Sequence, residues 1–246
     1  MVKVLVIGEI CTDRFVYGEI ERLSPEAPVP VLKPIELIEN TGMAGNVVEN
    51  LLSIDSTLQI KHWHQPEIIT KTRYVEKKSN HMIVRIDEGE NNYCSNIGYI
   101  DEAEIKNADI VIVSDYNKGF LSLDNIEKIG NISKLSLLDS KKILSNQIVS
   151  KYKFVKLNKN EYISNSHLTN NNNVFVTMGS DGAMYQNKLY KSPNPAETID
   201  VSGAGDTFVA SFILEFYKTN NIEQSIEYAN KMASIVVSKR GVAIPI

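Results

Sequence analysis

The sequence predicts an α/β fold in which a mostly parallel central sheet carries helices on its faces. Short runs rich in β-branched residues are nearly all apolar in their centres, which is typical of strands buried on both faces. Helical patterns lie between these runs, and strands that alternate with helices favour a parallel sheet. Two further segments break the alternation and indicate a small β element outside the main sheet.

The predicted strands are KVLVIG (3–8), DIVIVSD (109–115), KLSLLD (134–139), YKFVKL (152–157) and NVFVTM (173–178). The predicted helices cover residues 45–52, 123–129, 160–164, 206–217 and 222–238. The asparagine run at 170–173 is expected to be a solvated loop before the last of these strands. The chain shows no internal repeat.

The smaller β element is predicted from two stretches. APVPVLKPIELIE (27–39) is extended and punctuated by proline, and 68–88 contains two strand-like runs joined by the polar turn EKKSN, as in a hairpin. We therefore expect one domain over 1–246, with lid-like β segments around 14–38 and 68–88.

Composition limits the classes of function. The chain has 246 residues, of which 43% are hydrophobic, enough for a substantial core. The net charge of -4 is small and Lys and Arg are scattered, so neither nucleic acid nor a membrane surface is the expected partner. Cys11 and Cys94 lack CxxC spacing, which favours a reducing cytoplasm. The apolar run at the N-terminus is too short to span a bilayer.

The stretch DVSGAGDTFVASF (200–212) predicts an anion-binding site. Gly203, Ala204 and Gly205 carry little or no side chain, so backbone amides there can approach an anion, and the helix they open adds its positive end. Asp206 would repel a bound phosphate unless it accepts a proton from a substrate hydroxyl. The alternative is that Asp206 only caps the helix, and the tetrapeptide alone leaves both readings open.

Neighbouring motifs resemble those of the PfkB family of ribokinase-like sugar kinases, in which a G-A-G-D motif supplies the anion hole and the catalytic base. The resemblance implies a ribokinase-like fold and an ATP- and Mg²⁺-dependent carbohydrate kinase. It implies sugar contacts from Asp13, in GEICTDRFVYG, and from Gly42 and Asn46, in TGMAGNVVENL. On the nucleotide side it implies Asn158 and Glu161 of NKNE, Thr177, Gly179 and Gly182 of VTMGSDGAMY, and Asn230.

The segment ERLSPEAPVPVLK is similar to the corresponding stretch of bacterial heptose-phosphate kinases, and TKTRYV, VRIDE and SDYNKG match the same relatives in order. This similarity implies phosphorylation of heptose 7-phosphate at its anomeric hydroxyl, a step of ADP-heptose synthesis. Cations near these motifs are candidates for binding the phosphate of the sugar, or are solvated surface charges: Arg73, Arg85, Lys118 and Lys141. The resemblance also implies a homodimer through the lid segments.

The chain departs from these relatives in three places. After NLLSID a strand and a helix on the sugar side are trimmed, Met43 replaces a loop glycine, and Gly45 stands where alanine is usual. A methionine side chain could fill space that sugar would occupy, which favours a different sugar or small alcohol as an alternative substrate. A degenerate, non-catalytic sugar or nucleotide binder is a further alternative. No H-x-G-H nucleotidyltransferase signature occurs, so a kinase step alone is expected.

The residue types suit phosphoryl transfer, which needs positioning and charge neutralisation more than covalent chemistry. Asp206 would be the base, the amides of residues 203–205 would receive developing charge, and Asn158 with Glu161 would hold magnesium through water. His62 and His64 alternate along a strand and share one face, but no third ligand at a suitable spacing supports a metal site there.

Overall fold

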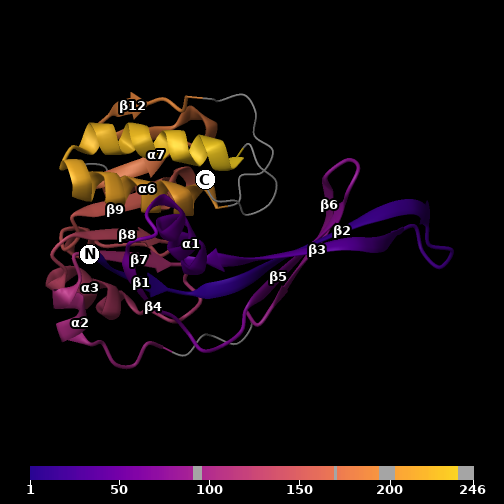
Figure 1. Ribbon diagram of the computed structural model, residues 1–246, viewed down its shortest axis with the longest axis horizontal. Helices are drawn as coiled ribbons and strands as arrows, with labels where there is room; N and C mark the ends of the chain where they lie inside the picture. The colour runs from indigo at the N-terminus through magenta and orange to yellow at the C-terminus, as the bar shows by residue number, and fades with distance from the viewer. Residues whose placement is uncertain (91–95, 169–170, 194–202, 238–246) are drawn as a thin grey trace.

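The computed structural model describes residues 1–90, 96–168, 171–193 and 203–237. Its strands are arranged in two sheets (Figure 1). The larger sheet contains β1 (Lys3–Gly8), β4 (Gln59–Trp63), β7 (Ile110–Asp115), β8 (Ser136–Ser140), β9 (Phe154–Asn158), β10 (Val174–Thr177), β11 (Ala183–Tyr185) and β12 (Lys188–Tyr190). The smaller sheet contains β2 (Ile10–Leu23), β3 (Pro30–Met43), β5 (Thr70–Glu76) and β6 (His81–Glu88).

The larger sheet has the strand order β12-β11-β10-β9-β8-β7-β1-β4, and the strands from β10 to β4 run parallel. Only β11 and β12 at one end pair antiparallel. The buried apolar runs of the sequence form the parallel strands, because a strand covered on both faces has no polar side to display. Their carboxyl ends therefore meet at one edge, where ligands bind in open α/β sheets.

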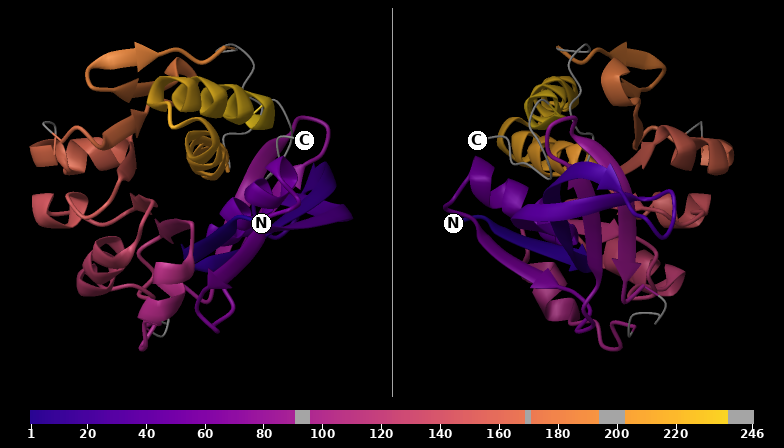
Figure 2. Two further views of the ribbon diagram at one scale, coloured as in Figure 1. Left: turned by 60° about the vertical axis from the view of Figure 1, so that its left-hand side comes forward. Right: turned by 90° about the vertical axis from the view of Figure 1, so that its right-hand side faces the viewer.

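Helices cover both faces of this sheet (Figure 2). Alternate residues of β1 separate between two cores: Val4 and Val6 pack with α1 (Ala44–Ile54), α6 (Ala204–Thr219) and α7 (Ile222–Val237), whereas Leu5 and Ile7 belong to the other core. That second core includes residues of α2 (Glu102–Asn107), α3 (Leu123–Ile132) and α4 (Asn146–Val149), with Tyr162 of α5 (Lys159–Ser164) packed against it. The strand period of two thus builds a three-layer α/β/α body.

The smaller sheet, which we call the lid, has the order β3-β2-β5-β6 and extends away from the body (Figure 1). The antiparallel β5–β6 hairpin lies where the turn EKKSN predicts it. The β2–β3 pair is longer than the predicted segment, because β2 starts one residue after β1 and β3 continues to Met43. The lid therefore includes Asp13 and Gly42 and connects directly to the first strand of the body.

The predicted helices are present, and most run one to three residues further than the apolar pattern indicates. Ser238, which ends the last predicted helix, lies outside the described residues, as do Cys94 and Asn170. The strand expected at His62 is β4, whereas the short α2 and α4 and the β11–β12 hairpin are not predicted from the sequence. These elements span three to six residues, too few for a periodic pattern to identify them.

The strand β4 forms an outer edge of the larger sheet and is followed closely by β5. This edge is where the sequence indicates a trimmed strand and helix. Within the described residues, no helix is both long and apolar enough to cross a bilayer.

Candidate active site

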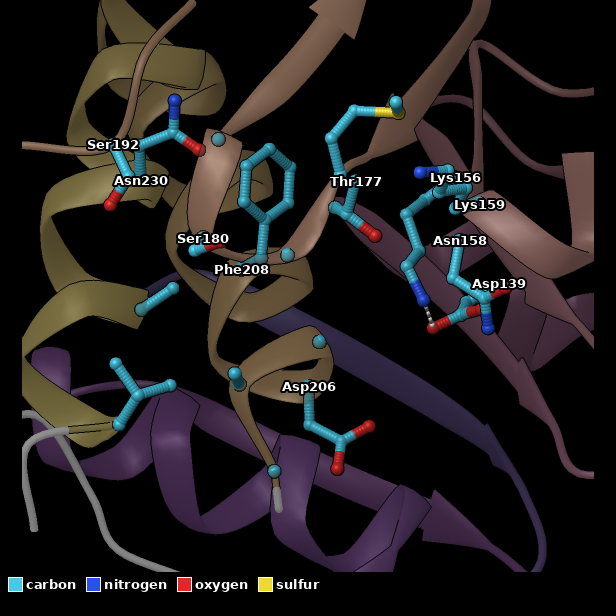
Figure 3. A pocket seen from close by; sticks show the side chains of 18 of the residues that line it. Asp139, Lys156, Asn158, Lys159, Thr177, Ser180, Ser192, Asp206, Phe208 and Asn230 are labelled. Atoms are coloured by element: carbon cyan, nitrogen blue, oxygen red, sulfur yellow. Dashed lines mark hydrogen bonds and ion pairs between the residues drawn. The ribbon is translucent and has the colours of Figure 1, made fainter. Parts of the chain in front are cut away.

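A cavity of about 570 Å³ lies at the carboxyl ends of the central strands, between them and the first turn of α6 (Figure 3). Asp206 and the pair formed by Lys156 and Asp139 lie at one end, and Asn230 lies toward the other. Residues of both the predicted anion hole and the predicted nucleotide site line the cavity: Asn158, Thr177, Gly179, Gly182, Gly203, Ala204, Gly205, Asp206 and Asn230.

Asp206 is in the first turn of α6, and its side chain is held by donors from two other elements. The Nδ2 group of Asn46 donates to Oδ2 at 2.9 Å, and the Tyr116 hydroxyl donates to Oδ1 at 2.8 Å. The helix N-cap is Gly203, with φ 81° and no side-chain cap bond. Helix capping is therefore not the role that this geometry gives to the Asp206 carboxylate.

Burial controls the titration of Asp206, which is only 5% exposed. Desolvation raises the pKa of its carboxyl group from 3.8 to about 6, although the hydrogen bonds from Asn46 and Tyr116 lower it. The nearby Asp139 raises the pKa further and Lys156 lowers it. A carboxylate with a pKa near 6 is ionised at neutral pH and is still basic enough to accept a proton in a transition state.

Lys156 is a buried cation at the same end of the cavity. It belongs to β9, is 4% exposed, and its Nζ lies 2.9 Å from Asp139 Oδ2 on β8. Burial alone would lower the pKa of this ammonium group, but the carboxylates of Asp139, Glu161 and Asp206 raise it overall. A methyl group built on Gly205 would lie 3.4 Å from Lys156 Nζ, so the cation stands beside the amides that open α6.

Asn158 and Glu161 form a capping box at the start of α5. Asn158 Oδ1 accepts from the Glu161 backbone N–H at 2.9 Å, and Glu161 Oε2 accepts from the Asn158 backbone N–H at 2.7 Å. Lys141 Nζ pairs with Glu161 Oε1 at 3.0 Å. Asn158 lines the cavity, and the carboxylate of Glu161 contacts its side-chain amide at 2.6 Å.

This oxygen-rich pair fits a hydrated magnesium ion better than a metal caged by protein. Mg²⁺ keeps several waters and takes one or two carboxylates together with substrate phosphates. Among the described residues, no group of three or more His, Cys, Asp or Glu side chains could hold a metal. His62 and His64 do not belong to such a group. Their rings lie 4.9 Å apart and contact the backbone carbonyls of Gly8 and Gln65.

The far end of the cavity is formed by backbone turns. Gly182 has φ 105°, and a Cβ there would lie 2.1 Å from the Tyr190 carbonyl oxygen, so only glycine fits. Gly179 also has positive φ, at 66°. Asn230 on α7 donates to the same Tyr190 carbonyl at 2.8 Å, and thus fixes the helix against this turn. Thr177 ends β10 beside it.

The predicted sugar residues meet on the lid side of Asp206. Asp13 forms an ion pair with Arg73 across the β2–β5 ladder. A Cβ on Gly42 would lie 2.1 Å from Asp13 Oδ2, so glycine is required to make room for this carboxylate. Asn46, from α1, contacts Asp206 itself. Desolvation raises the pKa of the buried Cys11 thiol to about 12. The charges of Asp13 and Asp206 also raise this pKa, and that of Arg73 lowers it.

Lys118 is held in a cluster of charges that the sequence does not predict. Its Nζ lies 2.7 Å from Glu90 Oε2, and Lys71 Nζ lies 3.1 Å from Glu90 Oε1. Lys71 is the ladder partner of Asp13, so this cluster adjoins the predicted sugar residues. Arg85 is the ladder partner of Arg73 and so shares its face of the lid, but its side chain is exposed on β6 and pairs with Asp87.

Met43 and Gly45 are both buried at the start of α1. The Met43 side chain is 4% exposed and packs in the core that contains Cys11 and Ile69, with φ 56°. The side chain therefore fills space in the core, and does not occupy open space at the predicted sugar site as the sequence suggests it could. A Cβ on Gly45 would lie 3.0 to 3.2 Å from Ile10 and Thr41, which leaves little space for alanine.

Sequence reasoning misses Tyr116, Asp139, Lys156, Lys71 and Glu90. Three of these had a usable signal: Tyr116 and Asp139 stand at or next to carboxyl ends of apolar strands, and Lys156 interrupts the apolar run FVKL. A lysine inside a doubly covered parallel strand needs a buried partner, and ligand sites lie at such strand ends. Lys71 and Glu90 carry no comparable signal.

The fold and the cavity define a class: an α/β protein with a buried carboxylate in the first turn of a helix that opens with small residues. The chain belongs to the pfkB family of carbohydrate kinases, whose model, described as "pfkB family carbohydrate kinase", matches residues 50–246. The family predicted from the sequence motifs is confirmed.

Curated relatives match nearly the whole chain. "Bifunctional protein HldE" of Helicobacter pylori (strain J99) is 31% identical over 303 residues, covering 99% of this chain and 64% of the relative. The protein of the same name from Nitratiruptor sp. is 28% identical over 294 residues, covering 98% of this chain and 62% of the relative. The chain thus spans less than two thirds of these relatives. Both alignments are longer than its 246 residues, so the relatives contain residues that it lacks.

Solved structures confirm the ribokinase-like fold. Ribokinase from Thermotoga maritima matches with a TM-score of 0.69 at 14% identity, over 98% of this chain and 95% of that chain. Phosphofructokinase-2 from Escherichia coli matches with a TM-score of 0.69 at 13% identity, over 99% and 95%. The ribokinase of Arabidopsis thaliana, solved with ribose and ATP, matches with a TM-score of 0.67 at 15% identity, over 98% and 94%.

Proposed function

We propose that this chain transfers the γ-phosphoryl group of ATP to a hydroxyl of a phosphorylated sugar, with heptose 7-phosphate and its anomeric hydroxyl as the first candidate. The observation that carries the proposal is the buried Asp206 carboxylate, whose pKa is raised to about 6 beside the amides of Gly203 to Gly205. A protein that only binds ligands has no need for such a base. The sequence similarity to heptose-phosphate kinases supports the choice of sugar.

In this proposal Asp206 accepts the proton of the acceptor hydroxyl as the hydroxyl oxygen bonds to the γ-phosphorus. The bond between that phosphorus and the β–γ bridging oxygen breaks, and ADP leaves with its electron pair. General-base assistance of this kind contributes about 10²- to 10⁴-fold in rate. The proton ends on a carboxyl group whose pKa burial has already raised, so Asp206 accepts it more readily than an exposed aspartate would.

Charge on the moving phosphoryl group would be met by groups that are already in place. The first turn of α6 offers free backbone amides and the positive end of the helix dipole. Lys156 stands beside Gly205, and Lys141 stands beside Glu161. Magnesium, when bound near Asn158 and Glu161, would supply further neutralisation of phosphate charge. Preorganised donors and cations of this kind carry most phosphoryl-transfer catalysis.

The proposed nucleotide site is the part of the cavity away from Asp206. Thr177, Gly179, Gly182 and Asn230 line it, and the backbone turns there leave the volume open. Phe208, Ala233 and Val237 add apolar surface from α6 and α7, which suits the flat face of a nucleobase. With the triphosphate directed toward Gly203 to Gly205, the γ-phosphate would reach the end that holds Asp206.

The lid side supports a phosphorylated acceptor. Lys71, Arg73 and Lys118 are only partly exposed and pair with Asp13 or Glu90. An incoming phosphate dianion would compete with the Glu90 carboxylate for Lys71 and Lys118, because it offers more acceptor oxygens and more charge. A neutral sugar would have no such use for three converging cations.

The test is ATP consumption by the purified chain with a panel of acceptors: heptose 7-phosphate, other sugar phosphates, the corresponding free sugars and small alcohols. The proposal predicts turnover with phosphorylated sugars and a far higher KM, or none, with the free sugars. Preference for an unphosphorylated sugar or alcohol would show that the acceptor is not a sugar phosphate. Nucleotide binding without turnover on any acceptor would favour the non-catalytic binder.

We also propose that the chain forms a homodimer through the outer face of the lid. By the ladder register, Val16, Leu37, Tyr74, Val84 and Ile86 share the face opposite to Asp13 and Arg73. Leu37, Val84 and Ile86 are between 43% and 57% exposed. Because burying apolar side chains is favourable, an exposed apolar patch of this kind is typical of a surface that another protein chain covers. Analytical ultracentrifugation of the parent chain and of Leu37→Glu tests this proposal. A monomer mass for both proteins would refute it.

The cysteine pattern favours the cytoplasm as the place where the protein acts.

A further inference from the structure

Tyr116 is fixed by contacts on three sides. Its backbone N–H donates to Glu9 Oε2 at 2.8 Å, its hydroxyl donates to Asp206 Oδ1 at 2.8 Å, and its ring lies 4.8 Å from Lys141 Nζ. Glu9 is fully buried and also accepts from the Lys118 backbone N–H at 2.9 Å, so the loop after β7 is clamped from both ends. A side chain held in this way has one orientation, and that orientation directs its hydroxyl at the carboxylate.

We propose that the Tyr116 hydroxyl is a positioning group for the catalytic base: it holds the Asp206 carboxylate in its ionised form and in one orientation within the cavity. Tyr116 acts through Asp206 and not on the transferred group. The inference rests on the proposed function, in which Asp206 is the base.

The phenol can only donate in this setting. Burial raises the pKa of the Tyr116 hydroxyl well above 10, and the charge of Asp206 raises it further, so the hydroxyl keeps its proton at neutral pH. A donor stabilises the ionised carboxylate more than the protonated acid. A carboxylate has about four lone-pair directions, and Tyr116 and Asn46 occupy one on each oxygen. Positions for a substrate hydroxyl therefore remain.

Other groups also face Asp206, and their effects on its pKa can be distinguished from that of Tyr116. Asn46 on α1 is uncharged and donates to the other oxygen. Asp139 on β8 raises the pKa of Asp206, and Lys156 on β9 lowers it. Cys11 on β2 keeps its proton at neutral pH because burial raises its pKa to about 12. Removing the Tyr116 hydroxyl changes no net charge, so any change in titration of Asp206 comes from the lost hydrogen bond.

The variant Tyr116→Phe tests the proposal, with Tyr152→Phe as the matched control. Tyr152 is also buried and donates at 2.6 Å to the Ile126 carbonyl oxygen. Both variants lose one buried hydroxyl bond, but only the first touches Asp206. The direct readout is the pKa of Asp206, measured on the full chain by ¹³C NMR of labelled aspartate carboxyl groups and assigned by its loss in Asp206→Asn.

We expect the pKa of Asp206 to rise from about 6 to about 7 or higher in Tyr116→Phe, since hydrogen bonds to charged groups are the strong ones. It should stay at the parent value in Tyr152→Phe. An unchanged or lower pKa in Tyr116→Phe would overturn the proposal. This titration needs no turnover, so it decides the role of Tyr116 even if the panel of acceptors shows no kinase activity.

Turnover adds a second readout. The acid limb of the pH–rate profile should move upward with the pKa, so that Tyr116→Phe loses about tenfold at pH 5.5 and stays within about threefold of the parent at pH 8.5. An equal loss at every pH would refute the role. If Tyr116→Phe does not fold, the parent still provides a test. The ¹³Cζ resonance of Tyr116 should titrate with Asp206, and a flat resonance would overturn the proposal.

Discussion

Replacing Asp206 with asparagine keeps the shape of the side chain and removes its ability to accept a proton. Under the proposed mechanism, turnover falls by about 10²- to 10⁴-fold, the usual contribution of a general base. ATP binding survives, because the first-turn amides of α6 and the cation of Lys156 remain. It could tighten once a negative charge near the phosphates is gone.

The effect on folding follows from the raised pKa. The Asp206 carboxyl group titrates near 6 when folded and near 3.8 when unfolded, so the folded state binds the proton more tightly. Stability therefore falls as pH rises from about 4 to about 6, by about 3 kcal/mol for a difference of about two pH units. Asparagine removes this penalty. The asparagine amide has only one acceptor oxygen, so either Asn46 or Tyr116 loses the oxygen to which it donates, which costs about 1–3 kcal/mol.

The two effects nearly cancel at neutral pH, so we expect a melting temperature close to that of the parent at pH 7.5 and a lower one at pH 4. Turnover, nucleotide affinity and melting temperature should be measured at both pH values. Near-normal turnover in Asp206→Asn would refute the assignment of the base. If the difference in melting temperature between Asp206→Asn and the parent is the same at pH 4 and pH 7.5, the pKa of Asp206 is not raised by burial.

Three further predictions concern residues in and around the candidate site. Glu161→Gln preserves the capping box, since glutamine also serves in it, but should raise the magnesium requirement and lower turnover several-fold; an unchanged magnesium titration would count against the metal role. Met43→Gly should alter acceptor preference more than ATP affinity and destabilise by about 2–5 kcal/mol through lost core packing, partly offset at its positive φ. A change confined to ATP affinity would show that the loop does not face the sugar. Lys156→Met should cost about 3–5 kcal/mol by leaving Asp139 buried and unpaired. Adding Asp139→Asn should restore much of the stability without restoring turnover, and restored turnover would exclude a role for the cation.

Local sequence was sufficient for the parts of the site that consist of backbone. Gly203 to Gly205 ahead of an apolar run, the N-x-x-E spacing and the glycines at 179 and 182 are each features of a few consecutive residues, and all but Glu161 of these line the cavity. Their geometry is decided by which residues can adopt positive φ or leave an amide exposed. Those preferences are properties of the individual residues, so they can be seen in the sequence.

The apolar strands and their order along the chain were likewise visible, because a strand buried on both faces must be apolar throughout. The lid boundaries were less clear. β2 and β3 are each 14 residues long and mix buried with exposed positions. Their length depends on pairing with each other and with β5, which no local pattern shows.

What only the tertiary structure decided is the environment of the charges. Asn46, Tyr116 and Asp206 are separated by up to 160 positions in sequence, yet meet through two hydrogen bonds. The same is true of Lys71 and Lys118, which meet at Glu90. The pKa of a carboxyl group depends on desolvation and on charges within a few ångströms, and both are set by folding. The sequence by itself thus determined that an aspartate follows a turn of small residues, and the fold determined that this aspartate is buried, oriented and has a raised pKa.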